Sequence, residues 1–262
     1  MTKADEKRPV AVVTGGAGEI GSAIAKALGT SHRIALVDIN RAALDETVSR
    51  FAQNGIEARG FQTDLLDHQA VEQMGKDVSA WGTVKILVNN AGAGMAYSYQ
   101  DMTSDSLDKD LRLNLKAALA CFKAFEADLK DGGNVINIAS VNGLGTYGHP
   151  AYSAAKAGLI HATRQLAVEY GKFGMRANTI APGTVRTQAW VDRTSVNPNV
   201  FDEALTWYPL KQLPTPEDIA QAVTFLTSPH AQCITGICLP IDSGLTCGSP
   251  ALPRTFTQSA DF

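Results

Sequence analysis

The chain has 262 residues, of which 45% are hydrophobic and 19% are charged, and its formal net charge is −3. This length and composition suit one large α/β domain with an ample core, which we expect to span residues 1–262. The small net charge, without long runs of one sign, points to neither nucleic acid nor a membrane surface as a partner. Residues 1–9 are polar and charged, and no apolar stretch reaches the ~18 residues of a spanning helix. We therefore expect no signal peptide, no membrane span and a cytoplasmic location.

The four cysteines and five histidines are scattered along the chain. No Cys-x-x-Cys pair and no histidine cluster occurs among them. The sequence therefore predicts no bound metal and no disulfide bonds, but small thiols in a reducing compartment.

The first clear pattern is a strand, a turn and a helix near the start of the chain. An apolar run, Val10–Val13, leads into a glycine-bearing turn, Thr14–Gly21, and then into a helical pattern. A second apolar run, Ile34–Val37, ends in Asp38. This is the layout of a dinucleotide-binding unit. In such a unit the turn and the helix N-terminus hold a pyrophosphate, and the carboxylate accepts hydrogen bonds from the ribose hydroxyls. On this stretch alone a tight turn of another α/β fold stays open, but no Gly-Lys-Ser/Thr follows, which excludes a phosphate loop of the NTPase kind.

Apolar runs and helical patterns alternate through the rest of the chain. Helices are predicted over residues 41–53, 67–81, 105–130, 151–170 and 216–226, with Ser104 or Asp105 capping the third of these. Strands are predicted at residues 57–62, 85–88, 134–139, 176–180 and 237–241. This alternation predicts a Rossmann-type α/β fold, a doubly wound sheet of seven parallel strands with helices on both faces. Residues 184–215 are predicted to form a substrate loop or lid, and residues 249–262 a C-terminal tail.

Polar or glycine residues follow six of the predicted strands. They are Gly15, Asp38, Asp64, Asn90, Ser140 and the pair Pro182-Gly183. Ligands of a doubly wound sheet bind outside the carboxyl ends of its strands, so we expect these residues to share one edge and one site.

Tyr152 and Lys156 stand four residues apart on a predicted helix and therefore share one of its faces. A nearby ammonium favours the phenolate, so we expect Lys156 to lower the pKa of Tyr152 and make it an acid/base near neutral pH. Ser140 can donate a hydrogen bond to a substrate oxygen. The alternatives are an ordinary surface pair for Tyr152 and Lys156, a cap or loop role for Ser140, and a solvated mid-helix side chain for Asn114.

Together these motifs resemble those of the classical short-chain dehydrogenase/reductase family, over about residues 9–248. The shared elements are the Thr-Gly-x-x-x-Gly-x-Gly turn at 14–21, Asn-Asn-Ala-Gly at 89–92 and Pro-Gly at 182–183. Glu19 replaces the middle glycine of the turn. The family's catalytic tetrad falls on Asn114, Ser140, Tyr152 and Lys156.

The resemblance implies hydride transfer between a nicotinamide cofactor and a carbonyl or carbinol carbon. Tyr152 would pass the proton to or from the substrate oxygen, Ser140 would hold that oxygen, and Lys156 would bind the nicotinamide ribose. Asn114 would hold a water that links Lys156 to solvent. The implied cofactor-binding residues are Gly15, Gly18, Glu19, Ile20, Asp38, Ile39, Asp64, Leu65, Asn90, Gly92, Tyr152, Lys156, Pro182, Gly183, Val185 and Thr187.

The charges near the turn favour NAD over NADP as the cofactor. Asp38 would repel a 2′-phosphate and accept a 2′-hydroxyl, and Arg41 is the only cation close to it in the sequence. Glu19 is expected to turn its carboxylate to solvent and present only its backbone N–H to the phosphate, because an acid suits the first turn of a helix.

The resemblance also implies a substrate pocket. Its substrate-binding residues would be Ser140, Asn142, His149 and Tyr152, and its lining would include Met95, Tyr97, Tyr147, Trp190, Trp207 and Tyr208. Few charges in this lining favour a neutral secondary alcohol such as a polyol, a sugar or a cyclic alcohol, although the aromatic residues also fit packing anchors of a lid. The alternatives are a 3-oxoacyl thioester reductase and a non-enzymatic NAD-binding scaffold or sensor. Small residues within 117–121 are compatible with the homotetramer that is common in the family.

Overall fold

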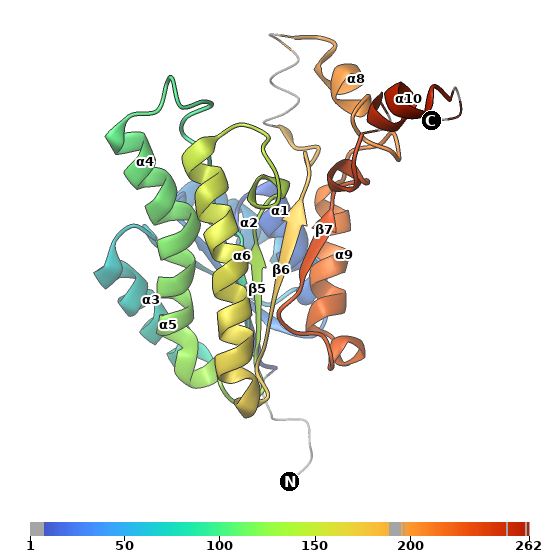
Figure 1. Cartoon of the computed structure of the whole chain (residues 1–262). Helices are drawn as coiled ribbons and strands as arrows, with labels where there is room; N and C mark the ends of the chain where they lie inside the picture. Colours follow the sequence, from blue (N-terminus) through green and yellow to red (C-terminus); the bar gives the residue numbers. More distant parts are fainter. Residues whose placement is uncertain (1–7, 189–194, 196, 250, 260, 262) are drawn as a thin grey trace.

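The computed structural model describes residues 8–188, 195, 197–249, 251–259 and 261. Seven strands in this part form one sheet with the order β3-β2-β1-β4-β5-β6-β7 (Figure 1), and every neighbouring pair is parallel. The strands are β1 Val10–Thr14, β2 Arg33–Asp38, β3 Ala58–Gln62, β4 Val84–Asn89, β5 Asn134–Ile138, β6 Arg176–Pro182 and β7 Cys238–Ile241. The order reverses between β1 and β4, so the predicted doubly wound, Rossmann-type fold is confirmed.

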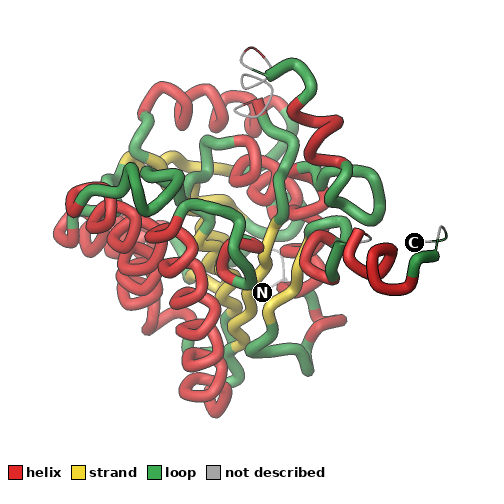
Figure 2. Tube along the Cα trace, turned by 45° about the horizontal axis from the view of Figure 1, so that its top comes forward, coloured by secondary structure: helices red, strands yellow, loops and turns green. Residues whose placement is uncertain are grey.

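Helices cover both faces of the sheet (Figure 2). One face carries α1 Glu19–Leu28, α2 Arg41–Gln53 and α9 Pro216–Thr227, and the other carries α3 His68–Trp81, α5 Ala117–Leu129 and α6 Pro150–Tyr170. β1 shows why both faces need cover: Ala11 and Val13 pack into one core and Val10 and Val12 into the other, and all four are fully buried. This two-sided burial explains the unbroken apolar run in the sequence.

The prediction of a single α-helix over residues 105–130 is wrong in one respect, because the helix in the structure is interrupted. α4 covers Ser104–Leu111, a π-helical turn covers Arg112–Lys116, and α5 begins at Ala117. Such turns arise where a side chain disturbs the i→i−4 hydrogen bonds, and hydrophobic periodicity does not reveal them.

The predicted cap of this helix was also wrong, by one residue. Thr103 accepts a hydrogen bond on its side chain from the Ser106 backbone N–H at 3.1 Å, and Ser106 Oγ accepts one from the Thr103 N–H at 2.9 Å. This reciprocal pair is a capping box, with serine in the place usually taken by Glu or Gln.

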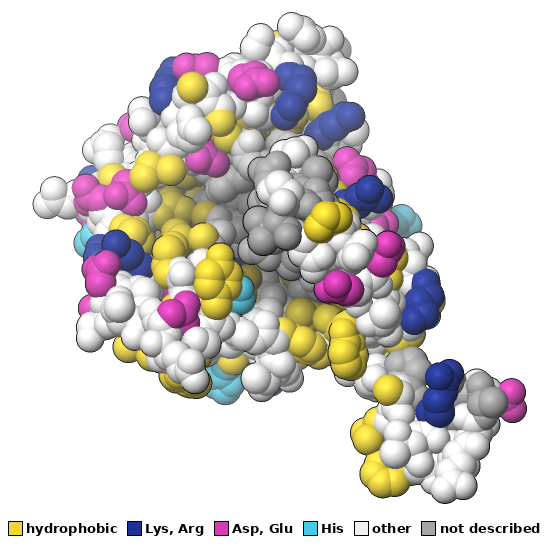
Figure 3. Space-filling model, turned by 90° about the horizontal axis from the view of Figure 1, so that it is seen from above, with side chains coloured by type: hydrophobic (Ala, Val, Ile, Leu, Met, Phe, Trp, Pro, Cys, Tyr) yellow, Lys and Arg dark blue, Asp and Glu magenta, His cyan; other side chains and the backbone are white. Residues whose placement is uncertain are grey.

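The predicted substrate loop or lid and the predicted C-terminal tail each contain a short helix. α8 covers Val200–Leu205 and α10 covers Ala251–Thr257. They lie beyond the carboxyl ends of the strands, and α10 stands away from the body of the molecule (Figures 1 and 3). Trp190, expected in the substrate lining, lies outside the described residues.

None of the described helices combines the length and apolarity needed to cross a membrane. Across the same residues, no three His, Cys, Asp or Glu side chains gather as metal ligands, and the four cysteines are free.

Candidate active site

The glycine turn after β1 is closed by contacts that exclude larger side chains. Gly15 has φ +60°, a left-handed conformation that favours glycine, and a Cβ on Gly21 would lie 2.1 Å from the Gly15 carbonyl oxygen. α1 begins without a side-chain cap at Gly18. Among the described residues, no acceptor reaches the N–H groups of Glu19, Ile20 or Gly21. These open donors at a helix N-terminus fit the pyrophosphate of a dinucleotide.

The segment after β4 braces this turn from the side. Thr14 Oγ1 accepts hydrogen bonds from the N–H groups of Asn90 (3.0 Å) and Ala91 (3.1 Å). The Asn90 amide in turn donates to the carbonyl oxygens of Thr14 (3.1 Å) and Gly15 (3.2 Å). Asn90 therefore shapes the turn through its side chain.

Asp38 lies where the adenosine ribose is expected, at the end of β2. Its Oδ2 accepts from the Ala17 N–H at 3.2 Å and its Oδ1 from the Asn40 N–H at 3.0 Å. A carboxylate has about four acceptor positions, so two remain for ribose hydroxyls. Ile39 beside it is 63% exposed, which leaves an apolar surface for a base. Asp64, at the end of β3, accepts from the Leu66 N–H at 2.9 Å and orders the next loop.

Asn114 lies in the π-helical turn and is almost completely buried. Its amide donates to the carbonyl oxygens of Asp110 (2.9 Å) and Ala93 (2.8 Å), and its Oδ1 accepts from the Ala93 N–H at 3.2 Å. A Cβ on Gly92 would lie 2.6 Å from Asn114 Oδ1 and 3.1 Å from Lys156 Nζ. Gly92 therefore allows Asn114 and Lys156 to approach each other, and Asn114 is not the solvated mid-helix residue considered as its alternative.

Ser140, Tyr152 and Lys156 meet between β5 and α6. Lys156 Nζ donates to the Ile138 carbonyl oxygen at 2.8 Å and lies 5.5 Å from the centroid of the Tyr152 ring. Ser140 Oγ donates to Asn142 Oδ1 at 3.2 Å and accepts from the Asn142 N–H at 3.2 Å. Tyr152 and Lys156 are therefore not an exposed surface pair.

The ionisation of this group differs from the expectation that Lys156 lowers the pKa of Tyr152. Burial raises the pKa of Tyr152; a hydrogen bond from Ser140 opposes this rise, and the Asp110 carboxylate adds to it. Burial also lowers the pKa of Lys156, to about 8. Desolvation is the largest cause of both shifts, because the charged form of each group loses its hydration in this enclosed space.

Ten of the twenty predicted catalytic, cofactor-binding and substrate-binding residues line one cavity of about 210 Å³. Its lining is Ile20, Asn90, Gly92, Ile138, Ala139, Ser140, Tyr152, Lys156, Pro182, Gly183, Val185 and Thr187. The first turn of α1, the segment after β4, the end of β5, α6 and the end of β6 with the residues after it thus converge at the carboxyl edge of the sheet, where the pattern of strand ends predicted a site.

A second cavity of about 880 Å³ shares part of this lining and opens toward the segment after β6. It is lined by Gly92, Ala93, Gly94, Ser140, Val141, Asn142, Tyr147, His149, Tyr152, Gly183, Thr184, Ala204, Trp207, Tyr208 and Leu245. No Lys, Arg, Asp or Glu occurs among these lining residues. Seen from above, this edge of the molecule is hollowed and hydrophobic side chains border it (Figure 3). Met95 and Tyr97, predicted in the lining, are absent from this set.

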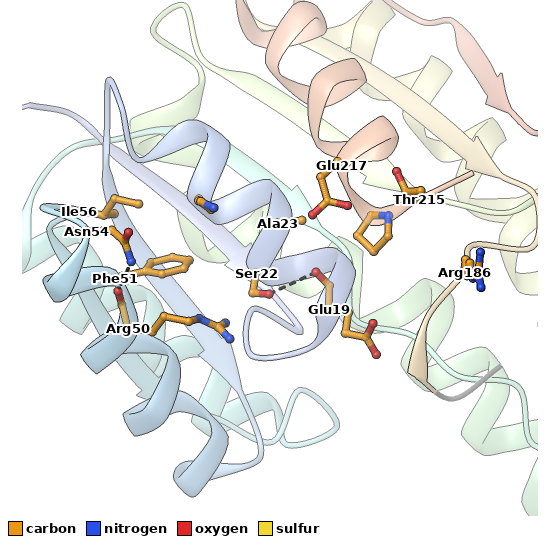
Figure 4. Close-up of a pocket in the computed structure, with 12 residues that line it drawn as sticks. Glu19, Ser22, Ala23, Arg50, Phe51, Asn54, Ile56, Arg186, Thr215 and Glu217 are labelled. Carbon is orange, nitrogen blue, oxygen red and sulfur yellow. Dashed lines mark hydrogen bonds between the residues drawn. The ribbon is translucent and has the colours of Figure 1, made fainter. Parts of the chain in front are cut away.

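Glu19 lies outside both cavities, on the outer side of the first turn of α1. Its carboxylate lines a groove of about 500 Å³ together with Arg186, Thr215 and Glu217 (Figure 4). Glu19 Oε1 accepts a hydrogen bond from the Gln188 backbone N–H at 2.7 Å. The side chain is exposed and turned away from the cavities, but it holds the chain after β6 rather than being only solvated.

Two residues near the site, Asp110 and Leu245, were not predicted from the sequence. Asp110 is fully buried four residues before Asn114, and its Oδ1 accepts from the Met95 N–H at 3.1 Å. An acid inside the apolar pattern of a helix was a signal for it. Leu245, which lines the larger cavity, follows the last strand, and its place at the carboxyl edge was the available signal.

Comparisons with known proteins identify the family of the chain. A family model described as Enoyl-(Acyl carrier protein) reductase matches residues 15–246. The chain is 37% identical over 247 residues to an uncharacterized oxidoreductase of Schizosaccharomyces pombe, covering 93% of both chains. It is 34% identical over 245 residues to a 2,3-dihydroxy-2,3-dihydro-p-cumate dehydrogenase of Pseudomonas putida, covering 90% of this chain and 94% of the relative.

A crystal structure of an oxidoreductase of the short-chain dehydrogenase/reductase family from Burkholderia thailandensis has a TM-score of 0.91 to this chain. The two are 38% identical, over 98% of this chain and 100% of the other. The predicted family is therefore confirmed, and with it an NAD(P) cofactor. The chain belongs to the short-chain dehydrogenase/reductase family of oxidoreductases.

Proposed function

We propose that the chain is an NAD-dependent oxidoreductase that interconverts a secondary alcohol and its ketone. The observation that carries the proposal is the 210 Å³ cavity, in which Ser140, Tyr152 and Lys156 meet Ile20 from the glycine turn and Thr187 from the segment after β6. A substrate carbon held there lies next to an acid/base and next to the place that the dinucleotide-binding layout gives to the nicotinamide.

The bound nicotinamide supplies the hydride acceptor or donor. Tyr152 gives its phenolic proton to the substrate oxygen in reduction and takes the proton back in oxidation, while Ser140 holds that oxygen by a hydrogen bond. Because burial raises the pKa of Tyr152, the phenolate requires positive charge nearby. Lys156 supplies it 5.5 Å from the ring, and its pKa of about 8 makes that charge sensitive to pH. Asn114 holds the Ala93 backbone behind Gly92 and, as in the family, orients water toward Lys156.

The choice of NAD over NADP rests on two carboxylates. Asp38 places negative charge at the ribose position, where it disfavours a 2′-phosphate. Arg41, the cation close to it in sequence, is paired with Asp45 at 3.0 Å, which leaves it less available to balance a phosphate. Both features support NAD.

The test is a turnover assay with NAD and a panel of secondary alcohols, in which the formation of NADH is measured by its absorbance. Tyr152→Phe should lower kcat/KM by about 10²–10⁴-fold, the usual contribution of a positioned acid/base. NADH affinity, measured by fluorescence titration, should stay near the wild-type value. Tyr99→Phe, at a side chain that is 78% exposed, is the matched control and should keep wild-type activity. Near-normal turnover by Tyr152→Phe would refute the proposed acid/base.

Two other functions are tested by the same measurements. A 3-oxoacyl thioester reductase is the second candidate, because the chain is 33% identical over 252 residues to an acetoacetyl-CoA reductase of Acinetobacter sp. and a 3-oxoacyl thioester also presents a ketone. Turnover of acetoacetyl-CoA with NADPH, in the absence of NAD-linked alcohol oxidation, would establish it. NADH binding without turnover of any carbonyl or alcohol would instead establish a scaffold or sensor.

We further propose that the enzyme is a cytoplasmic homotetramer whose partner in catalysis is a small molecule. The exposed side chain of Val168 on the outer face of α6, 80% accessible in the single chain, supports burial against another copy. Light scattering should give four times the mass of one chain, and a monomer mass would refute the assembly.

A further inference from the structure

His149 has a backbone conformation that is unusual for its residue type. Its φ of 52° and ψ of 68° lie in the left-handed region, directly before the first residue of α6. Its N–H donates to the Tyr97 carbonyl oxygen at 2.9 Å, and its own carbonyl oxygen accepts from the Ser153 N–H at 2.8 Å. Non-glycine residues in this region are strained and concentrate at functional sites, where the surrounding contacts hold them in place.

The imidazole ring of His149 is oriented by one hydrogen bond. Nδ1 lies 2.9 Å from the Ala96 carbonyl oxygen. A carbonyl oxygen only accepts, so Nδ1 must carry the hydrogen, and in the neutral ring Nε2 is then the unprotonated acceptor.

The Nε2 edge of the ring is the one left for a ligand. A Cβ on Gly94 would lie 2.8 Å from His149 Nδ1, so the Nδ1 edge faces the loop after β4. His149 lines the larger cavity, and Nε2 forms no hydrogen bond with any residue that the structure describes.

Two other polar side chains of this wall, those of Asn142 and Tyr208, already form hydrogen bonds within the protein. The Asn142 amide donates to the Gly148 carbonyl oxygen (2.9 Å) and to Ser153 Oγ (3.2 Å), and Tyr208 Oη accepts from the Thr184 N–H at 3.0 Å. The His149 ring centroid lies 6.1 Å from that of Tyr152. A free acceptor therefore stands beside the phenol that is proposed to take the reacting proton.

We propose that His149 Nε2 accepts a hydrogen bond from a hydroxyl on the carbon next to the reacting carbinol, so that the site selects vicinal diols and α-hydroxy ketones over simple alcohols and ketones. The inference rests on the proposed function of Tyr152. A second hydroxyl can bridge from the Tyr152 side of the cavity to Nε2, and an uncharged lining suits such a neutral polyhydroxy substrate. A substrate without that hydroxyl covers the half-buried His149 acceptor and leaves it unpaired, which is the basis of discrimination.

The test compares cis-1,2-cyclohexanediol with cyclohexanol, two alcohols that differ by the second hydroxyl. The wild-type kcat/KM should favour the diol by at least about tenfold, the effect of one hydrogen bond. His149→Phe keeps a ring but lacks Nε2, and should bring the diol-to-alcohol ratio close to one. The ratio within each variant is the readout, so a general loss of activity does not obscure it.

Two controls guard against a purely structural effect. His161→Phe alters an exposed histidine on the same helix and should keep the wild-type ratio. His149→Asn retains a residue type that tolerates the left-handed backbone but lacks an acceptor at the Nε2 position, so it should also lose the preference. A diol preference retained in both His149 variants, or absent from the wild type, would overturn the inference.

A binding measurement separates this inference from the proposed function. Calorimetry of each alcohol with the NAD complex of Tyr152→Phe needs no turnover. Tighter diol binding that disappears in the Tyr152→Phe/His149→Phe double variant supports the subsite, and equal binding of both alcohols overturns it. Absence of turnover by the wild type with every alcohol and ketone refutes only the proposed function.

Discussion

The two halves of the site are held together in different ways. On the cofactor side, between β1, β2 and β4, glycines let backbone meet backbone, and a Cβ on Gly21 would collide with the Gly15 carbonyl oxygen. On the substrate side, the wall of the larger cavity consists of side chains such as His149, Trp207 and Leu245, which come from distant segments. A turn of tightly packed backbone tolerates little change, whereas a wall of side chains changes with each substitution. We infer that the first half fixes the cofactor and the second half sets the substrate.

The largest effect on folding stability and cofactor affinity is expected in the glycine turn. Gly21→Ala places a methyl group 2.1 Å from the Gly15 carbonyl oxygen, and overpacking of this kind costs about 1–3 kcal/mol. Both the melting temperature and NADH affinity should fall, the latter by more than about tenfold. Gly171→Ala is the control, since a Cβ there meets no atom within 4 Å. Unchanged NADH binding in Gly21→Ala would show that the turn is not the cofactor site.

The next effect concerns which cofactor the first half accepts. Asp38→Asn removes the charge that repels a 2′-phosphate, so the ratio of kcat/KM for NADP to that for NAD should rise about tenfold. Asp131→Asn, at a side chain that is 93% exposed, should leave this ratio unchanged. A wild type that already prefers NADP would contradict the proposed role of Asp38.

A third prediction addresses the acid buried beneath the substrate side. The Asp110 carboxylate raises the pKa of Tyr152, so Asp110→Asn should lower that pKa. The increase of kcat/KM for alcohol oxidation with pH should then occur at lower pH. The exposed Asp108→Asn, on the same helix, should not move the profile. A profile that stays in place, or moves to higher pH, would show that Asp110 does not act on Tyr152.

Asp110→Asn should also increase the folding stability at pH 7. Burial raises the pKa of Asp110 in the folded protein, so folding stability is lost as pH rises above the ordinary Asp pKa and through the raised value. Asp110→Asn avoids this loss and keeps an oxygen for the Met95 N–H. Its melting temperature should therefore exceed that of the wild type at pH 7, with the difference shrinking toward pH 4. An equal or lower melting temperature at pH 7 would contradict this account.

The smallest effect is expected at Glu19, which replaces the middle glycine of the family's turn. Glu19 directs its carboxylate to the Gln188 N–H, so Glu19→Gly should change the dissociation constant of NADH by less than about tenfold, or 1.4 kcal/mol. Glu19→Gln keeps the acceptor and should have a still smaller effect. Tightening beyond tenfold in Glu19→Gly would show that the carboxylate intrudes on the phosphate.

The cofactor half was largely predictable from the sequence. Its residues follow buried strands, and the carboxyl ends of parallel strands must lie along one edge, so Gly15, Asp38, Asn90 and Ser140 were placed correctly on that edge. The substrate half was predictable only through resemblance, because its wall depends on where loops cross the edge. Met95 and Tyr97 were assigned to the lining, but the larger cavity does not include them.

The sequence by itself determined the doubly wound sheet and the family, and it predicted the four residues of the tetrad, because periodicity and spacing are local properties of the chain. The tertiary structure decided the π-helical turn that buries Asn114, the unpartnered Oδ2 of Asp110 among the described side chains, and the hydrogen bond that orients the His149 ring. It also reversed the expected pKa shift of Tyr152. Each of these depends on desolvation and on hydrogen bonds between residues distant in the chain, which a linear pattern does not contain.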